Sequence, residues 1–128
     1  MGRKRTISIR ARLLGLAGLA AQVSARVAEE KRAEAQLSAA QADFERAQID
    51  LKRRQALLAS GSVSGDELTK AQNAHAAAQA NLASAKAAIV QASANRVAAQ
   101  GAREANAALI DQASGDSNPE ILLARAKR

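Results

Sequence analysis

The chain has 128 residues, with 19 Lys and Arg against 12 Asp and Glu, a formal net charge of +7 and no cysteine. The missing cysteine excludes a disulfide scaffold, a cysteine zinc site and a thiol nucleophile. Alanine supplies 35 residues and aromatic side chains only 1%, so the large side chains of a compact core and the β-branched and aromatic residues of a β protein are scarce. The abundant Ala, Gln, Glu, Lys, Arg and Leu predict an all-α protein built from long helices.

Residues 1–28 form a basic N-terminal segment, because no acidic residue precedes Glu29. An apolar stretch over residues 13–21 is followed by Val23-Ser24-Ala25, which resembles a small-residue cleavage site. The segment therefore has the features of a secretory signal or transit peptide. It is equally compatible with the first turns of the following helix, or with an amphipathic helix on a membrane surface. No apolar run reaches the roughly 18 residues that span a bilayer.

A heptad repeat predicts a first helical arm over residues 29–60. Its large positions, which begin before the arm, are Leu16, Val23, Leu37, Phe44, Leu51 and Leu58, with Glu30 in the one polar position. Its companion positions are Ala33, Ala40 and Ala47. Alternating large and small layers are typical of the seam of a coiled coil, where small residues let two helices approach closely.

The turn between the two arms carries strong local signals. Gly61 can adopt the left-handed conformation that ends a helix. Ser64 and Glu67 form a capping box, in which the Ser64 hydroxyl accepts from the Glu67 amide and the Glu67 carboxylate accepts from the Ser64 amide. Val63 and Leu68 occupy the positions of a hydrophobic staple. A connection this short makes the two arms antiparallel neighbours.

A second heptad predicts a second arm over residues 65–110. Its large positions are Leu68, His75, Leu82 and Ile89, and the register continues through Arg96, Arg103 and Ile110. Its companion positions are Ala71, Ala78, Ala85, Ala92 and Ala99. His75 is the only histidine and has no cysteine or acidic cluster beside it in the sequence, so we expect it to pack in the seam and to bind no metal.

The two heptads predict a pairing if their seams face each other across a tip at residues 61–64. The expected partners are Leu58 with Leu68, Leu51 with His75, Phe44 with Leu82, Leu37 with Ile89, and Glu30 with Arg96. The only polar position of the first arm then meets an arginine. After the hairpin we expect a linker over residues 111–118 and, from the Asn118 cap and Pro119, a short further helix over residues 119–128.

The pattern of polar residues argues against an enzyme. The acidic residues are dispersed, and the sequence contains no Ser/His/Asp arrangement, phosphate-binding glycine loop or dinucleotide motif, so we expect no catalytic residue and no cofactor. The positive charge leaves open an alternative in which the N-terminal segment and Lys52-Arg53-Arg54 bind nucleic acid or an anionic membrane surface. Because the basic residues do not line one helix face and aromatic side chains are almost absent, we expect no nucleic-acid partner.

Residues 42–89 resemble the α-hairpin of HlyD-type membrane fusion proteins of the EmrA-like branch, which are the periplasmic adaptors of tripartite efflux pumps and type I secretion systems. The family's tip pattern, Arg-x3-Leu-x6-Ser, is present as Arg53, Leu57 and Ser64. The resemblance implies that these three residues dock onto a TolC-like outer-membrane channel. An arginine there could bind carboxylates or carbonyls at the channel rim, and Leu57 would add an apolar contact.

Each tip residue also has a purely structural explanation. Ser64 caps a helix, Leu57 adjoins the seam, and Arg53 fits a solvated helix face. The resemblance further implies a periplasmic protein associated with the inner membrane, an inner-membrane transporter as a second partner through domains absent from this chain, and a homo-oligomer of the full protein. We expect the chain to be a fragment of such an adaptor.

Overall fold

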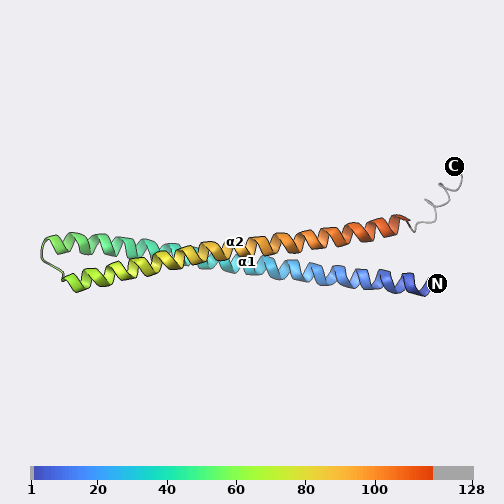
Figure 1. The fold of residues 1–128 in the computed structure, drawn as a ribbon, viewed down its shortest axis with the longest axis horizontal. Coiled ribbons are helices and arrows are strands. Elements are labelled where there is room, and N and C mark those ends of the chain that lie inside the picture. Colours follow the sequence, from blue (N-terminus) through green and yellow to red (C-terminus); the bar gives the residue numbers. More distant parts are fainter. Residues whose placement is uncertain (1, 117–128) are drawn as a thin grey trace. The chain divides into compact units, whose positions relative to one another are not determined.

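The computed structural model describes the backbone of residues 2–116 and the side chains of residues 10, 11 and 13–113. This part of the chain consists of two helices, α1 (Gly2–Ala59) and α2 (Gly65–Asp116). A short turn joins them into a hairpin, drawn in green at the α1–α2 junction in Figure 1. The all-α, two-helix coiled-coil hairpin predicted from the heptads is confirmed.

The structure agrees with one of the alternatives predicted for the N-terminal segment and differs from the prediction near the C-terminal end of α2. Helix α1 begins at Gly2, so residues 2–28 are its first turns. Helix α2 continues to Asp116, and the linker predicted over residues 111–118 is therefore wrong for residues 111–116. Nothing in the sequence between Asp111 and Ser114 stops a helix, because the nearest glycine is Gly115. The further helix predicted over 119–128 lies outside the described residues.

The contacts of the chain divide it into two compact units. The tip unit is Glu29–Ser93 and contains the turn with the adjoining parts of α1 and α2. The terminal unit combines residues before position 29 with residues after position 93. Within the terminal unit the side chains of Val23 and Ala99 are buried, as expected for a large and a small seam position.

In the tip unit, the predicted seam is the covered face of both helices. Its half-buried large residues are Leu37, Phe44, Leu51, Leu68, His75, Leu82 and Ile89. The alanine layer is covered further, since Ala33 is 6% and Ala71 4% exposed. The short alanine side chain is covered by the larger side chains around it. Those larger side chains extend beyond the contact between the two helices and stay partly exposed to solvent. The core of this unit is therefore a thin apolar stripe and not a dense interior.

Leu58 is an exception to the predicted seam. Its side chain is 39% exposed and belongs with the exposed large hydrophobic residues. Leu58 lies in the last turn of α1, which ends at Ala59, and there the chain is already turning toward α2. The prediction that Leu58 pairs within the seam is wrong because the heptad continues in sequence beyond the point where the partner helix begins.

Within the tip unit, the predicted pairing of the two helices is also wrong. The ring centroids of Phe44 and His75 lie 5.1 Å apart, whereas we expected Phe44 opposite Leu82 and His75 opposite Leu51. In the expected pairing, seven residues, or about 10 Å along the helix axis, would separate the levels of Phe44 and His75. Side chains lean toward the N-terminus of their own helix, which would move these two rings further apart. The 5.1 Å contact excludes that arrangement.

A slide of about half a heptad accounts for the observed contact. From this contact we infer that large residues of one helix in the tip unit lie opposite alanines of the other, with Phe44 level with Ala78. Large side chains facing each other would hold the helix axes apart and leave a void at each alanine layer. When each large side chain faces a small one, all layers are filled at the same distance between the helix axes. The burial of Ala33 and Ala71 agrees with this packing.

The predicted pair of Glu30 and Arg96 stays a prediction. Glu30 belongs to the tip unit and Arg96 to the terminal unit, and both side chains are half-buried. Within its own helix, Arg96 Nη1 donates to Gln100 Oε1 at 2.9 Å.

Candidate functional site at the hairpin tip

Helix α1 ends in a Schellman motif. Gly61 has a φ of 76°, and its amide donates to the carbonyl of Leu58 at 3.0 Å. The Ser62 amide donates to the carbonyl of Leu57 at 2.9 Å, and the Ser60 hydroxyl donates to the same carbonyl, also at 2.9 Å. These two backbone bonds define the motif and satisfy carbonyls that have no partner within the helix. The predicted role of Gly61 is confirmed.

The left-handed backbone of Gly61 leads to a stability prediction. Gly61→Ala should destabilise the hairpin by about 1 kcal/mol, because a Cβ is disfavoured at positive φ. Apart from Gly61 itself and the two adjoining residues, no atom of the described part of the chain lies within 4 Å of the added Cβ, so the cost is conformational and not steric. Gly101→Ala is the matched control: Gly101 lies inside α2 with equally open surroundings, and alanine there should stabilise by about 0.5–1 kcal/mol. Thermal melts that shift both variants in the same direction would contradict the assignment.

Helix α2 begins with the predicted cap. The Glu67 amide donates to Ser64 Oγ at 3.1 Å, and the Leu68 amide donates to the Ser64 carbonyl at 3.2 Å. Asp66 and Glu67 place negative charge in the first turn, where the helix dipole favours it. The second half of the capping box does not form: the Glu67 carboxylate, expected on the Ser64 amide, instead faces Arg54. A guanidinium attracts a carboxylate more strongly than a neutral amide does.

Val63 and Leu68 flank this cap. Both side chains are half-buried although the residues between them are exposed. Partial burial at these two positions is what a hydrophobic staple requires. Their direct packing on each other stays a prediction.

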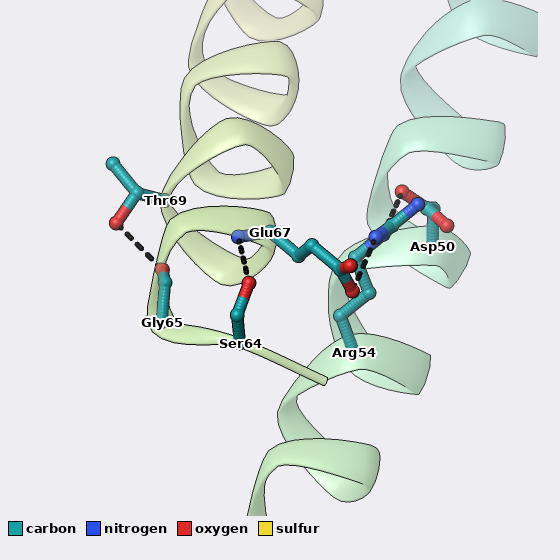
Figure 2. A network of polar contacts seen from close by, with 6 residues as sticks. All are labelled: Asp50, Arg54, Ser64, Gly65, Glu67 and Thr69. Carbon is teal, nitrogen blue, oxygen red and sulfur yellow. Dashed lines mark hydrogen bonds and ion pairs between the residues drawn. The ribbon is translucent and has the colours of Figure 1, made fainter. Parts of the chain in front are cut away.

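A three-residue ion cluster links the two helices beside the turn (Figure 2). Arg54 Nε donates to Asp50 Oδ2 at 3.1 Å, one turn earlier on α1. Arg54 Nη1 lies 3.6 Å from Glu67 Oε2 on α2. One guanidinium thus joins a carboxylate of its own helix to a carboxylate of the opposite helix, using the fork of donors that is particular to arginine.

The sequence analysis did not identify this cluster, although a signal was present. The companion layer of the first heptad is Ala33, Ala40 and Ala47, and its next member is Arg54. An arginine where the pattern calls for alanine indicates a long side chain directed at the partner helix. From the sequence, Arg54 is assigned only to the basic run Lys52-Arg53-Arg54.

The predicted docking residues Arg53 and Leu57 lie one turn apart on α1. Arg53 is exposed, and in the part of the chain that the structure describes its guanidinium has no hydrogen bond or ion pair. Leu57 is 38% exposed, since position C″ of the Schellman motif is Ser62, which offers it no apolar partner. A free guanidinium and a partly exposed leucine therefore share one helix face near the turn.

Ser64 lies across the turn from these two residues. It is exposed, and its Oγ is occupied as an acceptor by the Glu67 amide. Its hydroxyl proton is free to be donated to another group. The structural explanation for Ser64 is thus established by geometry, and a role in docking would use the remaining donor.

An open groove of about 900 Å³ runs between α1 and α2 in the tip unit. Alanines, among them Ala47, Ala74 and Ala78, form much of its lining, and Arg53 borders it. Small side chains allow a close approach to the backbone here. The surface that carries Arg53 is therefore continuous with a groove extending away from the turn.

Neither of the two helices is long and apolar enough to cross a membrane, as judged over the described residues. In the same part of the chain, no three His, Cys, Asp or Glu side chains gather as metal ligands would. The chemistry available at the tip is that of recognition: an unpaired guanidinium, an aliphatic side chain and a hydroxyl donor.

Comparison with known proteins places this hairpin in a family. The model of the EMRA alpha-helical hairpin domain matches residues 10–95, about two thirds of the chain. No curated protein and no solved structure matches significantly. The matched residues include the turn, the ion cluster and the tip residues described above, and on this match the chain belongs to the EmrA alpha-helical hairpin domain family.

Proposed function

We propose that this hairpin is the docking element of a periplasmic adaptor that connects an inner-membrane transporter to a TolC-like outer-membrane channel for efflux or secretion. Membership of the EmrA hairpin family supports an adaptor role. The contacts with the channel are made by Arg53, Leu57 and Ser64. The transporter is engaged by other parts of the adaptor, and the complete adaptor acts as a homo-oligomer at the inner membrane.

The observation that carries the proposal is the state of Arg53. Among the residues that the structure describes, the exposed guanidinium of Arg53 has no ion-pair partner, while that of its neighbour Arg54 is held by two carboxylates. An unpaired arginine is available for bidentate bonds to carboxylates or carbonyls of a partner. Leu57 on the same face supplies an apolar contact that excludes water from such bonds. Arginine is enriched among the residues that dominate binding energy at interfaces, where neighbouring contacts exclude water.

The test is retention of the chain on an immobilised, detergent-solubilised TolC-type channel. Arg53→Asp should lower the affinity by about 30-fold or more. This is the loss expected when an interface residue that contributes about 2 kcal/mol to the binding free energy is replaced by one of opposite charge. Circular dichroism should show unchanged helicity, because the side chain is exposed.

Arg32→Asp is the matched control. Arg32 is an exposed arginine of α1 in the same unit, so the substitution makes the same change in net charge about 30 Å along the helix from Arg53. Its retention should equal that of the unsubstituted chain. Equal losses of retention in the two variants would show that net charge alone causes the effect. Normal retention of the Arg53→Asp variant on the channel would refute the docking assignment.

A further inference from the structure

We propose that Arg54 is a positioning residue, which tethers the first turn of α2 to α1 through Glu67 and so presets the spacing between the two sides of the tip. This inference rests on the proposed docking function, because it assigns a role to the spacing of the docking residues. Arg53 and Leu57 lie on α1 before the turn, and Ser64 lies after it, as the cap that precedes α2. A partner that contacts both sides requires a defined distance between them.

The contacts of Arg54 and Glu67 form a continuous chain across the tip (Figure 2). Asp50 Oδ2 accepts from Arg54 Nε at 3.1 Å and thereby restricts the arginine side chain to one orientation. Arg54 Nη1 then lies 3.6 Å from Glu67 Oε2. The backbone amide of Glu67 donates to Ser64 Oγ at 3.1 Å. The orientation of the Ser64 hydroxyl is thus linked through two residues to the helix that carries Arg53.

The exposure of the cluster indicates a role in positioning rather than in stability. The side chains of Arg54, Asp50 and Glu67 are 36%, 44% and 50% exposed, and ion pairs this accessible to water add little to folding stability. Yet Arg54 occupies a seam position where the three preceding companion residues are alanines. An arginine that contributes little stability at a position suited to alanine needs another explanation, and fixing the geometry of a recognition surface lowers the ordering cost of binding.

The first arm of the test measures the spacing directly. The chain has no cysteine, so cysteines introduced at exposed Gln55 and Lys70 can be spin-labelled without background. Glu67→Gln removes the negative charge that faces Arg54 and keeps the backbone amide at position 67, which donates to the Ser64 cap. The interlabel distance distribution should broaden in Glu67→Gln and in Arg54→Gln, with helicity unchanged. Arg54→Lys, which keeps a charge facing Glu67 but lacks the fork of donors that also binds Asp50, should restore only part of the narrow distribution.

The second arm measures retention on the same TolC-type channel. Glu67→Gln and Arg54→Gln should each weaken retention by about three- to tenfold, the effect of ordering one or two more side chains on binding. Arg54→Lys should recover part of the loss. Arg32→Gln is the control and should change neither measurement. Glutamine and arginine have similar helix propensities, so lost helicity does not account for the result.

The outcomes separate this inference from the proposed function. If the Arg53→Asp variant loses retention on the channel while the Glu67→Gln and Arg54→Gln variants are retained normally, the docking function stands and the positioning role is refuted. An unchanged distance distribution in both variants also refutes it, whatever the retention. If Arg53→Asp retains normally, the docking function itself fails, and with it any role for a preset spacing in docking.

Discussion

Proline at position 71 is expected to unfold the tip unit, whereas proline at position 65 is not. Ala71 is 4% exposed and lies inside α2. Its replacement removes a helical hydrogen bond and sets the ring against the carbonyl one turn earlier, at a cost of about 3 kcal/mol or more. A two-helix unit whose core is a thin alanine-rich stripe has little stability in reserve. Circular dichroism should show a large loss of helix at room temperature in Ala71→Pro.

Gly65→Pro introduces the same ring six residues earlier with the opposite result. Gly65 is the first residue of α2, where the amide has no partner within the helix. Its φ is not positive, and no atom lies within 4 Å of an added Cβ. The preceding Ser64 is a cap, with the extended backbone that proline requires of its neighbour. We expect about 0.5 kcal/mol of added stability. Equal melting of the two variants would contradict the cap at Ser64.

Leucine in place of Ala33 is expected to destabilise the hairpin by about 1–3 kcal/mol, because the added methylenes have no space. Ala33 is 6% exposed and belongs to the small layer that large residues of α2 cover. The substitution also tests how the helices are paired. With the large-opposite-large pairing, an alanine layer would be a void, and leucine would fill it and stabilise. The sign of the change in the free energy of unfolding distinguishes the two arrangements.

Ala35→Leu is the matched control. Ala35 is exposed two residues further along the same helix, and the change there should stay within about 0.5 kcal/mol. Chemical denaturation with a common m-value measures both variants. A gain in stability for Ala33→Leu would restore the pairing first predicted and overturn the one described here.

The residues of the tip show how far local reasoning reaches. The left-handed Gly61, the Ser64 cap and the seam face of each helix were predictable, because their interactions span at most one turn of chain. The capping box was half wrong because Glu67 had a choice of partners. Its alternative partner, Arg54, lies on the other helix and comes close only after folding. The charge-assisted pair with Arg54 forms in place of the hydrogen bond to the local Ser64 amide.

The amino-acid sequence by itself determined that this protein forms two helices, where the turn between them lies, and which face of each is covered. Those properties follow from helix propensity, caps and a seven-residue period, all of which act within a helix. Only the tertiary structure decided which turn of α1 lies level with which turn of α2, and therefore that Phe44 meets His75 and Arg54 meets Glu67. A repeating pattern looks the same after the helices slide past each other, so the axial position is chosen by how large side chains fill the space beside small ones.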